Sequence, residues 1–223
     1  MTYQELEKEF KINTKQVDKF LNYLLATNKK MNLTAITNKE EMISKHIYDS
    51  LLISKVYDFS NKLVLDVGSG GGFPGIPLAM IFPTAHFVLL DSTEKKVNYL
   101  KKVIVELNLT NVEAKYARVE ELNEREKYDV VIARALSELR IYLELVTYLA
   151  KVRGNVIALK GSKANEELKA SDYALKALGL SLNKIQASMI PSGEKRVNFV
   201  FQKNKITENK YPRTFALIKK NPL

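Results

Sequence analysis

The sequence predicts an α/β fold in which helices cover both faces of a mostly parallel, seven-stranded sheet. Three observations lead to this prediction. Short apolar runs alternate with stretches of helical periodicity between residues 61 and 178, which is typical of parallel β/α units. A glycine-rich segment separates the first predicted strand from the first predicted helix of that series. Two further strands, joined by the turn signal PSGE, end the series as an antiparallel pair.

Residues 1–60 are predicted to form a helical extension in front of the sheet. Apolar residues over 17–25 follow the i, i+3, i+4 spacing of an amphipathic helix. Asn38 and Glu41 resemble the N-cap pair of another helix, which carries apolar residues onward to Leu52. We therefore divide the chain into a helical extension, a main domain and a basic C-terminal tail, over 1–60, 61–203 and 204–223.

The elements of the main domain follow from the same patterns. The predicted strands are 63–66, 86–91, 112–116, 129–133, 155–160, 182–190 and 195–203. The predicted helices are about 74–82, 94–107, 138–151 and 163–178. Gly179 is expected to stop the last of these helices.

The segment NKLVLDVGSGGGFPGIPLAMIFP, at 61–83, is the most informative part of the sequence. A strand that runs through glycines into a helix brings its backbone close to a nucleotide, and glycine permits that approach. Gly70, Gly72 and Gly75 satisfy the G-x-G-x-x-G pattern of dinucleotide-binding enzymes, which stay an alternative. Pro74 and Pro77 argue against a dinucleotide, because they remove amides that a pyrophosphate needs.

Two carboxylates favour a different ligand. Asp66 ends the first strand beside Gly68, where it suits a cationic or zwitterionic ligand, although it can also merely end the strand. Asp91 ends the next strand, 23 positions past Gly68, where an acidic residue accepts both hydroxyls of a ribose. This order resembles the Rossmann-like fold of class I S-adenosylmethionine-dependent methyltransferases, which implies S-adenosylmethionine as the cofactor.

Composition narrows the range of functions. The chain has no cysteine, which excludes disulfides and thiolate nucleophiles, and its two histidines make a metal site unexpected. No apolar run reaches the ~20 residues of a membrane span. The start, MTYQELEKEF, is too acidic for a signal peptide. We expect a cytoplasmic, monomeric protein without a metal or a membrane partner.

Positive charge is concentrated in the last third of the chain. The net charge is +10, and residues 151–223 hold 15 Lys/Arg against 5 Asp/Glu. A one-sided basic surface predicts a nucleic-acid partner; a lysine-rich solvated face is the alternative. Lys160, Lys163 and Arg196 are the predicted RNA phosphate contacts, and they too can be ordinary solvated charges.

The residues after the fourth strand limit which atom can accept the methyl group. Arg134 to Ser137 read RALS, and no Asn/Asp-Pro-Pro-aromatic loop for an exocyclic amine occurs in the chain. C5 methylation of a pyrimidine needs a cysteine, which is absent. Guanine N7 has a free lone pair and no hydrogen, so its methylation needs positioning and no general base.

Several motifs together resemble one family. They are DVGSGGGFPGIPLA (66–79), DSTEKK (91–96), RVEE (118–121), ARAL (133–136), LKG (159–161), NLTAI (32–36) and KHIYDSL (45–51). From about residue 20 to 203 the chain resembles the glucose-inhibited division B family of ribosomal RNA guanine-N7 methyltransferases. The resemblance implies methyl transfer to a guanine, expected at position 527, in the 530 loop of 16S rRNA. It also implies that the substrate is the assembled small (30S) subunit.

The resemblance also implies roles for individual residues. Arg134 is predicted to be catalytic, at the mouth between cofactor and substrate, or else a surface partner of Glu138. From its helical neighbours Ile43 and Ile47, His46 is expected to be a half-buried, hydrogen-bonded histidine, with a catalytic base as the alternative. The residues predicted to bind the cofactor are Asp66, Gly68, Gly70, Phe73, Asp91, Ser92, Val119, Glu120 and Arg134.

Other functions stay open at this stage. One is a non-catalytic RNA-binding protein with a methyltransferase fold, and another is a methyltransferase that acts on a small molecule or a protein. The intact glycine loop, Asp91 and Arg134 favour catalysis on RNA.

Overall fold

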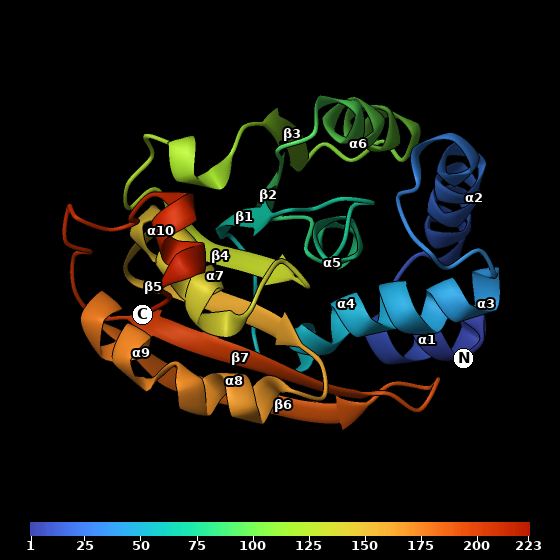
Figure 1. Cartoon of the computed structure of the whole chain (residues 1–223). Coiled ribbons are helices and arrows are strands. Elements are labelled where there is room, and N and C mark those ends of the chain that lie inside the picture. The colour runs from blue at the N-terminus through green and yellow to red at the C-terminus, as the bar shows by residue number, and fades with distance from the viewer.

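A computed structural model describes all residues of the chain, 1–223. Seven strands form one sheet in the order β3-β2-β1-β4-β5-β7-β6 (Figure 1). Their bounds are β1 Leu63–Val67, β2 His86–Asp91, β3 Val112–Tyr116, β4 Tyr128–Arg134, β5 Ala150–Lys160, β6 Leu180–Met189 and β7 Lys195–Lys203. Strands β1 to β5 pair in parallel, whereas β7 runs antiparallel to β5 and to β6. The predicted α/β class, the mostly parallel sheet and the terminal antiparallel pair are confirmed.

Helices cover both faces of this sheet. Their bounds are α1 Tyr3–Phe10, α2 Thr14–Met31, α3 Lys39–Met42, α4 Asp49–Leu51, α5 Gly75–Ile81, α6 Glu94–Glu106, α7 Leu139–Val146, α8 Ala164–Ala170, α9 Asp172–Leu178 and α10 Phe215–Lys220. One hydrophobic cluster joins the sheet to α1, α2, α5 and α6, and a second joins it to α7, α9 and α10. Val64 lies in the first cluster and Leu65 in the second, because successive strand residues point to opposite faces.

Two predicted helices differ from the structure. The helix predicted over 138–151 ends at Val146; a 3₁₀ turn follows, and Ala150 already pairs with Tyr128 as the start of β5. Residues 147–150 are buried, so their apolar run does not distinguish a helix from a buried strand. The helix predicted over 163–178 is interrupted at Ser171, whose hydroxyl donates to the Glu167 carbonyl at 2.7 Å.

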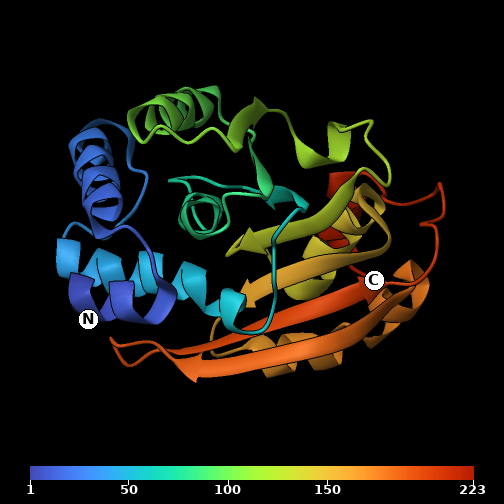
Figure 2. The ribbon, with the colours of Figure 1, turned by 180° about the vertical axis from the view of Figure 1, so that it is seen from behind.

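The N-terminal extension ends in one irregular helical segment. The Asn38 side chain accepts the Glu41 amide at 2.9 Å, which confirms the predicted N-cap. From α3 the chain continues as a π-helix over Ile43–Tyr48, then as α4 and a 3₁₀ turn over Leu52–Lys55. Figure 2 shows these segments at one end of the molecule, where the strands β4 and β5 end. None of the helices has both the length and the apolar character needed to cross a bilayer.

Candidate active site

Two cavities lie where the parallel strands end. The first, called here the glycine-loop cavity, has a volume of about 250 Å³. It is lined by Val67, Gly68, Leu90, Asp91, Ser92, Ala117, Arg118, Val119, Glu120, Leu136, Ser137, Leu145 and Phe215. The second, the charged cavity, has a volume of about 660 Å³. It is lined by Ile36, Lys45, His46, Asp49, Arg134, Ala135, Ser137, Glu138, Leu159, Lys160, Gly161, Glu167 and Arg196. Ser137 lines both cavities.

The glycine-loop cavity depends on the backbone at the end of β1. Gly68 has φ +72°, and a Cβ there would lie 2.7 Å from Leu136 Cδ1. Asp91 holds the loop: its Oδ2 accepts the Gly70 amide at 3.0 Å and its Oδ1 accepts the Thr93 amide at 2.9 Å. Each carboxylate oxygen has a further lone pair, so Asp91 can still accept ribose hydroxyls.

The predicted cofactor residues separate into two groups. Those that line the glycine-loop cavity are Gly68, Asp91, Ser92, Val119 and Glu120. Those that do not are Asp66, Gly70, Phe73 and Arg134. Gly70 contributes indirectly through its bond to Asp91. Phe73 packs against Phe20, with ring centroids 5.3 Å apart, and stacks on His46 at 4.7 Å, which places it behind the charged cavity.

Asp66 lies beneath the glycine loop and has no exposed surface. Its Oδ2 accepts the Gly75 amide at 2.9 Å, while its Oδ1 has no hydrogen-bond partner. Burial raises the pKa of this carboxyl to about 7, and the bond from Gly75 only partly opposes that rise. Asp66 therefore supports the loop from below and does not face a ligand in either cavity.

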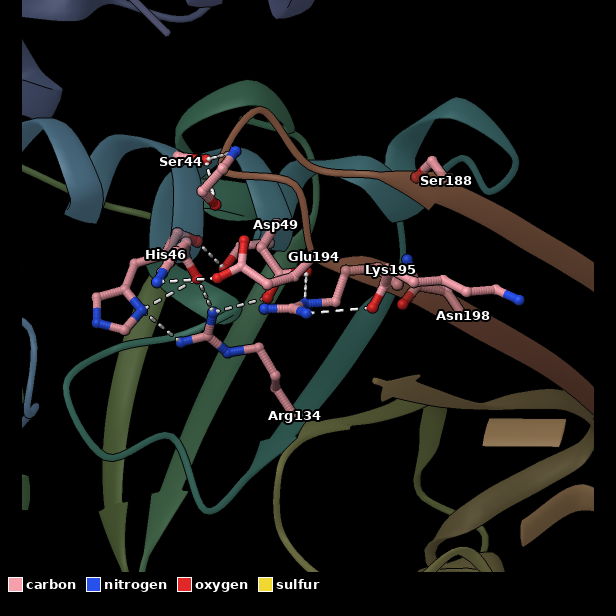
Figure 3. Close-up of polar contacts among 12 residues, drawn as sticks. Ser44, His46, Asp49, Arg134, Ser188, Glu194, Lys195 and Asn198 are labelled. Atoms are coloured by element: carbon pink, nitrogen blue, oxygen red, sulfur yellow. Dashed lines mark hydrogen bonds and ion pairs between the residues drawn. The ribbon is translucent and has the colours of Figure 1, made fainter. Parts of the chain in front are cut away.

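Arg134 is held in the charged cavity by groups of the N-terminal extension (Figure 3). Its Nη1 donates to the Lys45 carbonyl at 3.0 Å and to Asp49 Oδ2 at 3.3 Å. Its guanidinium carbon lies 5.0 Å from the centre of the Phe73 ring. The predicted alternative, a surface pair with Glu138, is wrong, because Glu138 pairs with Arg140 at 2.8 Å.

Asp49 joins two arginines that lie far apart in the sequence. Its Oδ2 accepts a hydrogen bond from Arg134, at the end of β4. Its Oδ1 accepts one from Arg196 Nε, on β7, at 3.1 Å. The carboxylate is buried, and its two ion pairs with the guanidinium groups offset the cost of removing its charge from water. Sequence reasoning gave Asp49 no role. One signal could have identified Asp49. It is a charged residue on the apolar face of the predicted helix 42–52, three positions after His46.

His46 is neutral in this network. Arg134 Nη2 approaches His46 Nδ1 at 3.3 Å, and the Lys45 carbonyl oxygen lies 3.2 Å from the same nitrogen. On the other side of the ring, Nε2 lies 2.7 Å from the Thr34 hydroxyl oxygen. Burial, with the charge of Arg134 as a further cause, lowers the pKa of His46 to about 3. The expected hydrogen-bonded histidine is therefore present, and its ring positions other groups.

The three predicted RNA contacts lie in different surroundings. Lys160 and Arg196 line the charged cavity, whereas Lys163 is exposed and lines neither cavity. The Lys160 side chain is 9% exposed and pairs with Glu167 at 2.7 Å. Lys160 and Arg196 are thus already engaged by carboxylates. Among the lining residues that the sequence did not predict are Lys45, Asp49, Leu136, Ser137, Leu145 and Phe215.

The arrangement suits transfer of a group between two bound molecules. A ligand with a ribose fits beside Asp91, and a planar, polar or phosphorylated ligand fits beside Arg134 and Arg196. Ser137 lies between these positions, because it lines both cavities. No cluster of three or more His, Cys, Asp or Glu side chains that could hold a metal ion occurs.

Comparisons with known proteins agree with this geometry. The GidB family model, described as rRNA small subunit methyltransferase G, matches residues 13–196. A protein of that name from Mesoplasma florum is 42% identical over 207 residues, covering 92% of this chain and 87% of that protein. One from Bacillus cytotoxicus is 39% identical over 226 residues, covering 97% and 95%.

Solved structures resemble the chain in fold. A SAM-dependent methyltransferase from Aquifex aeolicus has a TM-score of 0.57 at 18% identity, covering 79% of this chain and 97% of that one. M. jannaschii TYW2, solved with AdoMet, has a TM-score of 0.55 at 19% identity, covering 71% and 76%. At such identities the likeness concerns the fold alone.

Proposed function

The chain belongs to the GidB family of small-subunit ribosomal RNA methyltransferases, and we propose that its two cavities divide that reaction between donor and acceptor. The protein is an S-adenosylmethionine-dependent enzyme that methylates 16S rRNA of the small subunit. The observation that supports the proposal is that Ser137 lines both cavities, and it is there that we propose the methyl group passes from one to the other.

The glycine-loop cavity is the proposed cofactor site. Asp91 accepts the ribose hydroxyls with the lone pairs that Gly70 and Thr93 leave free. Val119 and Glu120 lie at the adenine end, and Gly68 permits close approach at the methionine end. When bound, S-adenosylmethionine supplies an electrophilic methyl group on its sulfonium.

The charged cavity is the proposed acceptor site. Arg134 and Arg196 present planar donors that suit a phosphate or the O6 edge of a guanine, and Asp49 fixes both. N7 of guanine carries no hydrogen, so these residues need only orient it. Burial lowers the pKa of His46 to about 3 and makes it a weak base, which agrees with a reaction that uses no general base. We propose N7 of a guanine in the 530 loop as the acceptor atom.

Methyl transfer to isolated small subunits tests this function. Subunits that lack the modification are incubated with the protein and S-adenosylmethionine labelled in its methyl group, and the rRNA is digested and mapped by mass. We expect one labelled 7-methylguanine in the 530 loop. Label on an exocyclic amine would contradict the proposed acceptor atom, and cofactor binding without any transfer would favour a non-catalytic RNA-binding protein. Heat of binding with NAD but not with S-adenosylmethionine would contradict the cofactor.

A further inference from the structure

An aromatic side chain from the C-terminal segment lines the glycine-loop cavity. Phe215 is the first residue of α10, and it is 42% exposed although it is large and apolar. Val119 and Leu145 line the same cavity. The GidB family model ends its match at residue 196, so Phe215 lies outside the part of the chain that the family match covers.

The segment that carries Phe215 is fixed by a buried ion pair. Arg213 donates from Nε to Glu144 Oε1 at 2.7 Å and from Nη2 to Glu144 Oε2 at 2.6 Å. Glu144 lies on α7 and has no exposed surface. A bidentate pair of this kind fixes both distance and orientation. Because Arg213 is only two residues from Phe215, it determines where α10 begins.

Two further contacts hold the same segment. Arg125 donates to the Thr207 carbonyl at 2.9 Å and to the Tyr211 carbonyl at 3.0 Å. Ile218 is fully buried in the hydrophobic cluster that contains α7, and Figure 1 shows α10 beside α7. Leu217, on the same helix, is 45% exposed and does not line the cavity. Phe215 is therefore held at the cavity by a helix whose position these contacts fix.

The position of Phe215 suits one part of the cofactor. The ribose belongs beside Asp91, and the apolar residues Val119 and Leu145 lie in the same cavity. Adenine has two flat apolar faces, and an aromatic ring in contact with such a face is favourable. We propose that Phe215 binds the adenine of S-adenosylmethionine, so that the C-terminal segment completes the cofactor site. The inference rests on the proposed function of the glycine-loop cavity.

Calorimetric titration of the full chain with S-adenosylmethionine tests the inference. Phe215→Ala should raise the Kd by about three- to tenfold, which corresponds to the contribution of one aromatic contact. Phe215→Tyr should keep the wild-type Kd, and Leu217→Ala, an equally exposed change on the same helix, should leave it unchanged. An unchanged Kd for Phe215→Ala would overturn the inference. Absence of binding by the wild type would instead overturn the proposed cofactor site.

A fluorescent variant gives a second readout. The chain has no tryptophan, so Phe215→Trp introduces a single reporter at this position. Its emission should change on addition of S-adenosylmethionine, whereas emission from Leu217→Trp should stay constant. Thermal melts of each variant should match the wild type, because both side chains are largely exposed. Constant emission from Phe215→Trp at a saturating cofactor concentration would overturn the inference.

Discussion

The two cavities are built in opposite ways. The glycine-loop cavity is made largely of backbone and apolar side chains at the ends of β1, β2 and β3, and Asp91 holds its loop through two main-chain amides. The charged cavity is made mostly of side chains from the N-terminal extension, the ends of β4 and β5, α8 and β7, and Asp49 joins the extension to β4 and β7. Only Ser137 lines both.

This difference suits two unlike ligands. A small cofactor can be recognised by a preformed backbone that needs glycine at one strained position and a carboxylate at another. An RNA substrate offers phosphates and base edges, which are recognised by charged side chains held in fixed directions. We therefore expect changes in the glycine-loop cavity to affect cofactor binding, and changes in the charged cavity to affect transfer to RNA.

The largest effect is expected for Gly68→Val. A side chain there meets Leu136 at 2.7 Å, and the backbone has φ +72°, which a β-branched residue resists. Affinity for S-adenosylmethionine should fall by about 100-fold or more, equivalent to ~2.7 kcal/mol, as measured by calorimetry.

Gly161→Val is the matched control for that change. Gly161 lines the charged cavity, and a Cβ at this position has no heavy atom within 4 Å. Its cofactor affinity should equal that of the wild type. Equal losses in both variants would mean that the two cavities do not bind different ligands.

The same contrast explains what could be predicted from the sequence. Gly68, Asp91 and Ser92 lie within two adjoining β/α units, so a local motif identifies them. Asp49 and Arg196 are 147 positions apart and meet only because β7 inserts between β5 and β6. No local pattern contains that contact, and the role of Asp49 was missed for this reason.

The directions of buried side chains could not be predicted from the sequence either. Asp66 and Phe73 stand beside the glycines in the sequence, but their side chains point away from the cavity, into the core. Proximity in a motif predicts proximity of the backbone, whereas the direction of each side chain depends on its contacts in the fold, such as the packing of Phe73 against Phe20 and the hydrogen bond from the Gly75 amide to Asp66.

A smaller effect is expected for Arg134→Lys. Lysine keeps the charge but loses the planar fork that contacts the Lys45 carbonyl, Asp49 and His46 together. The rate of methyl transfer to small subunits in single turnover should fall roughly tenfold, about 1.4 kcal/mol, while the cofactor Kd stays unchanged. A wild-type rate in both Arg134→Lys and Arg134→Ala would remove Arg134 from the reaction.

A change of a different kind, in stability and not in ligand binding or transfer, is expected beneath the glycine loop, for Asp66→Asn. The pKa of Asp66 is about 7 in the folded protein, against an ordinary value of 3.8. Between these values the folded chain keeps a proton that the unfolded chain loses, so the stability contributed by this group falls as pH rises from about 4 to 7. It changes no further above the folded-state value.

Asparagine at position 66 does not titrate. The melting temperature of Asp66→Asn relative to the wild type should therefore rise from pH 4 to pH 7 and then level off, as followed by circular dichroism. A difference between the two proteins that is constant with pH would show that Asp66 keeps an ordinary pKa and that its burial carries no electrostatic cost.

A crystal structure of the chain with S-adenosylmethionine would show whether the cofactor binds in the glycine-loop cavity and leaves the charged cavity for RNA. We expect the ribose beside Asp91, the adenine between Val119 and Phe215, and the sulfonium methyl directed past Ser137 toward the charged cavity. The charged cavity should stay open for RNA beside Arg134. Cofactor bound in the charged cavity, against Arg134 and Arg196, would show that the two cavities do not have the proposed roles.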